Sequence, residues 1–278
     1  MKVKAACLAA IVSAAACGGG GGGGGGDDDD GTDDGPTADA GQPGVDGAVV
    51  PDGPGLSGSL FDGQERTLVA EDVLACMETV CLYGESGADG SFYFEIEPPA
   101  AVALKTQEDL SIVPRRGAAL CPVSITGDEL VEVGPLHCPL LPDGVLFGPA
   151  SEDPQTLAPG DGLELTLRRA DLMPRVGDTL VDAAARLMPP SQVCSQLTIA
   201  GEEIIAVYAL HPFAAVSSSP IGVRVPSDVP ADTPVNFRTI SEIDGHFSEP
   251  VPGRADGTAA ATEAGAGITE LTWLVVSR

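Results

Sequence analysis

The chain has few basic residues. Its 278 residues include 14 Lys and Arg against 41 Asp and Glu, a formal net charge of −27 at pH 7. Nucleic-acid binding needs basic patches that neutralise phosphates, whereas Arg115–Arg116 and Arg168–Arg169 are isolated pairs. Anionic lipid headgroups are also expected to repel the body of the protein. The composition therefore argues against a nucleic-acid partner, and any membrane attachment must depend on something other than charge.

The chain also lacks common catalytic motifs. It contains no Gly-x-Ser-x-Gly, no His-Glu-x-x-His and no phosphate-binding loop outside one glycine tract. Aromatic residues make up 4% of the sequence, so stacking platforms for sugars are not evident. The three histidines, His137, His211 and His246, are each expected to be structural. We therefore predict that the protein is not an enzyme and uses no cofactor.

Two pairs of carboxylates remain as candidates for acid–base chemistry. Glu202 and Glu203 are adjacent, and neighbouring residues of a strand point to opposite faces. Glu242 and Asp244 share a face only if a strand continues to Asp244, where Gly245 indicates a turn. Both pairs are therefore expected to be solvated surface groups.

The N-terminal apolar run is too short to cross a membrane. Residues 5–16 would span about 18 Å as a helix, well short of the roughly 30 Å hydrocarbon core. Lys2 and Lys4 precede this run, and Cys17 follows three alanines. This order is typical of a cleaved signal peptide. It resembles the signal peptides of bacterial lipoproteins, in which the cysteine becomes the lipidated first residue of the mature chain.

This resemblance implies a signal peptide at residues 1–16 and a lipid anchor on Cys17. Several acyl chains give stable attachment, so we expect the protein in the cell envelope, at the outer membrane, facing the periplasm or the surface. Ala14 stands where the lipoprotein motif prefers leucine. Two alternatives stay open: ordinary secretory cleavage after Ala16 with Cys17 unmodified, and an N-terminal helix of a cytosolic domain.

Residues 17–55 are predicted to form a disordered tether. They are mostly Gly, Asp, Pro and Ala, which cannot bury enough apolar surface to offset the entropy of ordering. Repulsion between the aspartates should extend the segment. Its acidic run, residues 27–35, lacks the alternating ligands and the final glutamate of a calcium loop. A solvated spacer is therefore favoured over a metal site.

The cysteines indicate an oxidising compartment. Of the seven, Cys7 and Cys17 belong to the N-terminal segment. The other five are the disulfide candidates Cys76, Cys81, Cys121, Cys138 and Cys194. The spacing of Cys76 and Cys81 suits a bridge across a tight hairpin. Cys121 and Cys138 can form a second bridge, in which case Cys194 is free, or Cys194 replaces one of them. A zinc site that recruits His137 beside Cys138 lacks the paired short spacings of structural zinc.

From about residue 56 the sequence predicts β structure throughout. Residues 163–168 and 222–225 alternate apolar with polar side chains, the period-2 pattern of half-buried strands. Residues 204–208 and 268–276 are rich in β-branched residues. Residues 179–188 fit a helical turn or a strand, and their neighbours favour a strand. The length suits two tandem β-sandwich domains, so the predicted fold class is all-β.

The first predicted domain, residues 56–140, carries a family resemblance in three segments. These are LSGSLFD at 56–62, VLAC at 73–76 and SGADGSFYF at 86–94. They are similar to carboxypeptidase regulatory-like domains, which are transthyretin-like sandwiches with a turn of the type Thr-Asp-x-x-Gly-x-Phe. Here Asp89 and Gly90 supply the turn, and Phe92 and Phe94 share one face. The resemblance implies a structural or recognition module without catalytic residues.

The second predicted domain, residues 145–278, contains the segments DGLELTL at 161–167, VYALHPF at 207–213 and SPIGVRVP at 219–226. These segments resemble the ZU5-type β-sandwich of bacterial surface lipoproteins, which implies a second binding or scaffolding sandwich. A rival family, the adhesin stalk modules with Lys–Asn isopeptide bonds, is disfavoured. Lys105 and Asn236 are the only lysine and asparagine after the signal peptide, and they fall in different predicted domains.

These features predict a lipid-anchored envelope protein that acts in binding, scaffolding or envelope assembly. Its partner is an unknown envelope protein or a glycan. Two other classes stay open: an accessory domain of a secreted enzyme or secretion system, and a hydrolase that uses scattered carboxylates. Asp, Glu and His clustered in a deep cleft would favour the hydrolase, whereas an exposed apolar loop patch would favour a partner-binding module.

Overall fold

The structure, a computed structural model, describes residues 53–278. Within these residues the only helical elements are two 3-10 turns, η1 (Arg169–Asp171) and η2 (Pro190–Gln192). The predicted all-β fold class is therefore confirmed. No helix in residues 53–278 is long and apolar enough to span a membrane. Cys17, the predicted signal peptide and most of the predicted tether lie outside the described residues.

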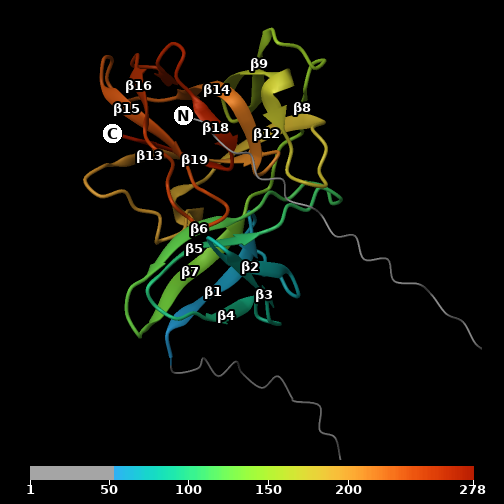
Figure 1. Cartoon of the computed structure of the whole chain (residues 1–278), viewed down its shortest axis with the longest axis vertical. Helices are drawn as coiled ribbons and strands as arrows, with labels where there is room; N and C mark the ends of the chain where they lie inside the picture. The colour runs from blue at the N-terminus through green and yellow to red at the C-terminus, as the bar shows by residue number, and fades with distance from the viewer. Residues whose placement is uncertain (1–52) are drawn as a thin grey trace, which may run out of the picture. The chain divides into compact units, whose positions relative to one another are not determined.

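The first half of the described chain is a sandwich of two small sheets. Its strands are β1 (Gly55–Asp62), β2 (Asp72–Met77), β3 (Val80–Glu85), β4 (Ser91–Glu95), β5 (Ala100–Thr106), β6 (Leu120–Ile125) and β7 (Leu130–Cys138). One sheet has the strand order β4-β1-β7 and the other has the order β3-β2-β5-β6. Their facing sides enclose a core that includes Leu60, Leu104 and Ile125. Figure 1 shows these strands in blue to green, gathered together.

The predicted turn before β4 is present. The Ser91 amide donates to the Asp89 carboxylate at 2.9 Å, and Gly90 has a φ of 79°, a left-handed conformation that favours glycine. Phe92 and Phe94 follow and are both buried, because alternate residues of a strand share one face. The prediction that these two rings share a face is confirmed.

The second half forms one 12-stranded sheet. Its strands are β8 (Val145–Leu146), β9 (Pro154–Gly160), β10 (Leu163–Arg168), β11 (Leu172–Met173), β12 (Asp182–Leu187), β13 (Ile204–His211), β14 (Ala215–Pro226), β15 (Pro234–Thr239), β16 (Val251–Ala255), β17 (Ala259–Thr262), β18 (Ile268–Leu271) and β19 (Trp273–Ser277). The main path runs β8-β12-β13-β19-β15-β16-β17-β14-β10-β9, and β11 and β18 pair with β14. β12 also contacts β9, so the sheet is nearly closed around its core.

Two sequence-based strand predictions are confirmed in this half. In β10, Leu163, Leu165 and Leu167 are buried and the residues between them are exposed, as the alternation predicts. The ambiguous segment 179–188 contains strand β12 rather than a helical turn.

A third hydrophobic cluster joins the two halves. Cys76, Ala103 and Leu120 of the first half pack with side chains of the second half that include Phe213 and Trp273. The Trp273 indole N–H donates to the Ala118 carbonyl oxygen at 2.9 Å. The division into domains 56–140 and 145–278 stays a prediction, but the two parts share this core.

Within residues 53–278 the cysteines form two disulfides, Cys76–Cys81 and Cys121–Cys194. The first links facing residues of the β2–β3 hairpin, as the spacing suggests. The bridge Cys121–Cys138, which the sequence analysis placed first, is not formed, and Cys194 takes the place of Cys138. The Ser195 hydroxyl donates to the Val133 carbonyl oxygen at 3.1 Å, which holds the segment after η2 against β7 and brings Cys194 to Cys121. Cys138 is buried and unbridged.

Candidate functional site

A hollow of about 390 Å³ lies between the two halves. We call it the junction cleft, and its lining consists of Gln107, Glu108, Leu110, residues 175–179 and residues 211–213. The segment after β5 supplies one wall, and the β11–β12 loop together with the end of β13 supplies the other. The cleft therefore depends on both halves of the chain.

His211 lines the junction cleft and is 5% exposed. Its Nδ1 lies 2.9 Å from both carboxylate oxygens of Glu108, and its Nε2 lies 3.8 Å from Asp182 Oδ1. Arg115 pairs with the other oxygen of Asp182 at 2.8 Å. Glu108 also accepts a 3.3 Å hydrogen bond from the Phe213 amide. Both ring nitrogens face carboxylates of the protein, so this arrangement suits positioning of the two walls better than proton transfer to a substrate.

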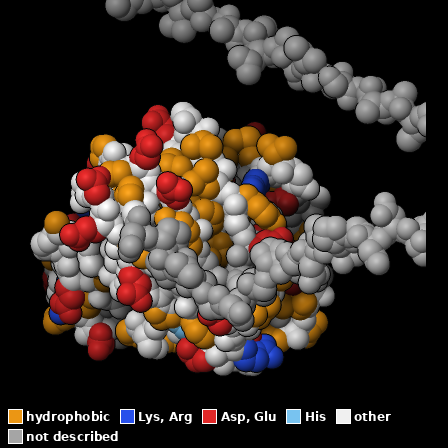
Figure 2. All heavy atoms as spheres, turned by 90° about the horizontal axis from the view of Figure 1, so that it is seen from below, with side chains coloured by type: hydrophobic (Ala, Val, Ile, Leu, Met, Phe, Trp, Pro, Cys, Tyr) orange, Lys and Arg blue, Asp and Glu red, His pale blue; other side chains and the backbone are white. Residues whose placement is uncertain are grey.

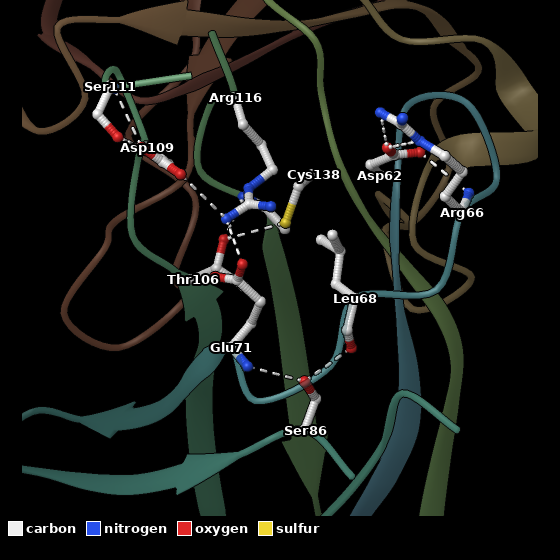
Figure 3. Close-up of polar contacts among 11 residues, drawn as sticks. Asp62, Arg66, Leu68, Glu71, Ser86, Thr106, Asp109, Ser111, Arg116 and Cys138 are labelled. Carbon is white, nitrogen blue, oxygen red and sulfur yellow. Dashed lines mark hydrogen bonds and ion pairs between the residues drawn. The ribbon is translucent and has the colours of Figure 1, made fainter. Parts of the chain in front are cut away.

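A second hollow, of about 350 Å³, adjoins the junction cleft at Gln107 and Glu108. Arg116 lines it and is almost fully buried. Its guanidinium donates to Glu71 at 2.6 Å and lies 3.6 Å from Asp109, and Figure 3 shows it pointing between these two carboxylates. Hydrogen bonding from the Ser111 hydroxyl is the main cause that lowers the pKa of Asp109. These contacts hold Asp109 and Arg116 against Glu71.

Cys138 lies beside this network in Figure 3, with its sulfur 3.3 Å from the Thr106 hydroxyl. Burial raises the pKa of the Cys138 thiol to about 11. The thiolate is the reactive form of cysteine, so Cys138 is expected to be chemically inert at neutral pH.

Two loops flank the junction cleft, one from each half. Residues 110–115 form a loop closed by paired backbone hydrogen bonds of 2.8 and 2.9 Å between Asp109 and Arg116. Residues 174–181 form the second loop, which contains a turn closed by the Asp178 amide on the Arg175 carbonyl oxygen at 3.0 Å. Val113 is 97% exposed at the first loop and Val176 is 100% exposed at the second. Apolar side chains therefore project into solvent beside a polar hollow.

A separate charged cluster at the junction surrounds Lys105, the one lysine of the described residues. Its buried ammonium group pairs with the Glu242 carboxylate and donates to the Glu242 carbonyl oxygen at 2.8 Å. Glu270 lies on β18, and the charges of Lys105 and Glu242 act on its carboxyl group. Burial, followed by repulsion from Glu242 and then Asp244, raises the pKa of Glu270 to about 7, although Lys105 opposes the shift.

We predict that Glu270 makes the folded protein less stable as the pH rises. The pKa of Glu270 is about 7 when folded against an ordinary value of 4.5, so its stabilising effect is complete below pH 4.5 and is lost between about pH 4.5 and 7. Glu270→Gln should match the wild type near pH 4 and exceed its free energy of unfolding by up to about 3 kcal/mol at pH 8, at 1.36 kcal/mol per pKa unit. Urea unfolding across this range measures the difference, and the exposed Glu129→Gln is the control. A Glu270→Gln curve parallel to the wild type would contradict the prediction.

The predicted carboxylate pairs point to separate partners. Glu202 is held by two hydrogen bonds from Arg238, at 2.6 and 2.7 Å, and by the Ser277 hydroxyl at 2.6 Å. The Arg238 bonds are the main cause that lowers the pKa of Glu202 to about 2. Glu203 instead pairs with Arg278 at 2.7 Å. Glu203 is exposed, as predicted, whereas the prediction of a solvated Glu202 is wrong, because its side chain is 20% exposed and bound to the buried Arg238.

The remaining predicted residues lie apart from the junction cleft. Asp244 pairs with the exposed His246 at 3.1 Å. His137 is buried, stacks on Phe61 with ring centroids 5.7 Å apart, and has its Nδ1 at 3.9 Å from Glu65. In residues 53–278 no group of three or more His, Cys, Asp or Glu side chains could hold a metal ion.

Of this group, His211 and Arg115 stand out in the sequence, Arg115 only as part of an isolated basic pair, whereas nothing there points to Glu108 or Asp182. These residues are far apart in the chain and meet only through the packing of the two halves. Comparison of the chain with family models and with curated proteins gives no match. The geometry of the junction is therefore the main guide to function.

Proposed function

We propose that this protein is a lipid-anchored binding or scaffolding protein of the bacterial cell envelope and that the junction cleft is its contact site. The observation that carries the proposal is the exposure of Leu110 and Val176, two apolar side chains from different halves of the chain that both line the cleft. Clustered exposed apolar side chains next to a hollow are typical of interaction sites. His211 is the group in the cleft best suited to acid–base chemistry, but both of its ring nitrogens face carboxylates of the protein. This arrangement favours a binding role for the cleft over proton transfer to a substrate.

Export is supported by the two disulfides and by the residues around Cys17. Disulfides persist in oxidising compartments. The order of basic, apolar and small residues before Cys17 is typical of a lipoprotein signal peptide. The resemblance of the first half to carboxypeptidase regulatory-like domains, and of the second to ZU5-type sandwiches, agrees with recognition modules held at a membrane by a tether.

Replacement of Cys17 tests the anchor. In a Gram-negative host fed an alkyne-tagged fatty acid, the wild-type chain should carry the label and sediment with the outer membrane. Cys17→Ala should lose the label and appear in the soluble envelope fraction, because no other acylation site remains at the predicted cleavage point. Cys7→Ala, which removes a cysteine within the apolar run, should behave like the wild type.

Two results would refute the anchor. One is membrane sedimentation of Cys17→Ala at the wild-type level. The other is an unlabelled wild-type chain in the soluble envelope fraction, which would support the ordinary secretory signal instead. Thiol alkylation of the exported chain should label only Cys138 among the described cysteines, because the other four are in disulfides. Labelling should require denaturation, because this thiol is buried.

A further inference from the structure

Lys105 stands out among the basic residues of the chain. Lys2, Lys4 and Lys105 are the only lysines, and all the other basic side chains are arginines. Figure 2 shows fewer basic than acidic side chains on one face of the molecule. Arginine is the usual residue of buried ion pairs, and the buried Arg116 and Arg238 hold carboxylates here. A lysine in such a place differs in one chemical property, because its amine can act as a nucleophile.

The Lys105 amine is held against a carboxylate of the other half. Its side chain is 6% exposed and contacts the Glu242 carboxylate, whose side chain is 17% exposed. The ammonium group also donates to the Glu242 main-chain carbonyl oxygen at 2.8 Å. Lys105 lies in β5 between β2 and β6, where it pairs with Leu74 and Leu120. The amine therefore projects from the interior of a sheet onto a single residue of the second half.

The loop that carries Glu242 is firmly placed on β5. The Ser241 amide donates to the His246 carbonyl oxygen at 2.8 Å, and the Gly245 amide donates to the Ser241 carbonyl oxygen at 3.0 Å. A Cβ on Gly245 would lie 2.5 Å from the Val102 carbonyl oxygen of β5, so the loop approaches this strand as closely as glycine allows. Well-oriented groups held together in this way can react as if their concentration were about 10⁵–10⁸ M.

Glu270 provides an acid for this pair. It is half-buried on β18, and burial, followed by repulsion from Glu242 and Asp244, raises its pKa to about 7 despite the opposing charge of Lys105. A substantial fraction of Glu270 is therefore protonated at neutral pH. A carboxylic acid of this kind can donate a proton to a leaving group and accept one from an attacking amine. The other titratable groups of the loop, Asp244 and the exposed His246, pair with each other at 3.1 Å.

We propose that Lys105 and Glu242 form an intramolecular amide bond, an isopeptide cross-link between the two halves. Proton transfer within the ion pair leaves a neutral amine and a carboxylic acid. The lone pair of Nζ then attacks Cδ of Glu242, so that a C–N bond forms and the bond from Cδ to the leaving hydroxyl breaks. Glu270 donates its proton to that hydroxyl and accepts one from Nζ, so one water molecule leaves and Glu270 ends as it began. No oxidant, reductant or second substrate takes part.

This cross-link goes beyond the proposed function, because it requires neither lipidation of Cys17 nor a partner in the junction cleft. It joins positions 137 apart in the sequence. It also removes two buried charges whose desolvation opposes folding. It differs from the Lys–Asn bonds of the adhesin stalk modules, since Asn236 lies against Glu202. A permanent ion pair is the alternative, and the masses of the peptides distinguish the two.

Peptide mapping of the full chain tests the bond. The chain is exported in a Gram-negative host, then purified, denatured, reduced, alkylated and digested with trypsin. Trypsin does not cut after an acylated lysine, so residues 67–115 should remain intact and be joined to residues 239–254. The joined peptide should weigh one water molecule less than the sum of its parts, and fragmentation should place the link on Lys105 and Glu242. Free peptides 67–105 and 239–254 with no joined peptide overturn the proposal, whether or not Cys17 is lipidated.

Intact mass with a charge-preserving variant gives a second test. Lys105→Arg keeps the positive charge but cannot form the bond. In a Cys17→Ala background, which carries no acyl chain, Lys105→Arg should have its full calculated mass, whereas the Cys17→Ala chain alone should be lighter by one water molecule. The exposed Arg168→Lys is the matched control and should keep the deficit. A deficit that persists in Lys105→Arg overturns the proposal, and the wild-type peptide map remains decisive if this variant fails to fold.

Glu270→Gln tests the role of the acid. In pulse-chase samples of exported chains, the joined peptide should form about a hundredfold more slowly than in the wild type, and the exposed Glu129→Gln should match the wild type. The wild-type rate should fall above pH 7, where Glu270 loses its proton, and the residual rate of Glu270→Gln should lack this dependence. Equal rates and pH profiles overturn the role of Glu270. Its effect on stability is separated from the bond in the Lys105→Arg background, which keeps the neighbouring charge.

Discussion

Removal of the Cys121–Cys194 disulfide is expected to lower the free energy of unfolding by about 4 kcal/mol through loop-closure entropy alone. The bridge joins residues 73 positions apart, whereas Cys76–Cys81 joins residues 5 apart. The unfolded chain gains more freedom when the longer loop is opened. The same relation gives about 2 kcal/mol for the hairpin bridge. The Cys121–Cys194 bridge should therefore be the more important of the two.

Alanine replacement of both cysteines of each bridge makes the comparison, with Cys138→Ala in every variant to prevent exchange. Urea unfolding followed by circular dichroism gives the two free energies. Cys121 and Cys194 are also buried, so lost packing adds to the larger effect. The expectation fails if opening the hairpin bridge costs as much as opening the long one.

The connectivity of this bridge shows where sequence reasoning reached its limit. The strands were predictable because alternation is local, and Leu163, Leu165 and Leu167 display it within six residues. The place of Cys194 depends on the segment after η2, which leaves the large sheet and packs on the first half. No spacing along the chain encodes that return, so proximity in sequence places Cys138 first as the partner of Cys121, with Cys194 only as the exchange partner.

The candidate site was less predictable than the fold for the same reason. Glu108, Asp182 and His211 come from three distant segments. Nothing in the sequence around each of them distinguishes it from an ordinary surface residue. Glu202 and Glu203 form a candidate acid–base pair in the sequence only because they are adjacent. The structure gives Glu202 and Glu203 different arginine partners. The turn at Asp89–Gly90 could be predicted because a turn, like a strand, is specified by adjacent residues.

A large single-residue effect is expected at Trp273, which packs where the two halves meet. The side chain is 1% exposed and its indole N–H donates to the Ala118 carbonyl oxygen. Trp273→Ala should lower the free energy of unfolding by about 3–5 kcal/mol, because it leaves a cavity in the shared cluster. Trp273→Phe should lower it by about 1–3 kcal/mol, chiefly because the Ala118 carbonyl loses its buried donor.

A matched core substitution separates the junction from general packing. Phe237 is fully buried in the core of the large sheet, away from the shared cluster, so Phe237→Ala should cost a similar 3–5 kcal/mol. Only Trp273→Ala should weaken the Glu108–His211 contact across the junction, and thermolysin should then cleave the Pro189–Gly201 region before global unfolding.

Trp273 is the only tryptophan, so the wild-type fluorescence transition reports this junction directly. Coincident fluorescence and circular dichroism transitions in the wild type would show that both halves unfold together, and early cleavage in Phe237→Ala alone would contradict a junction role for Trp273.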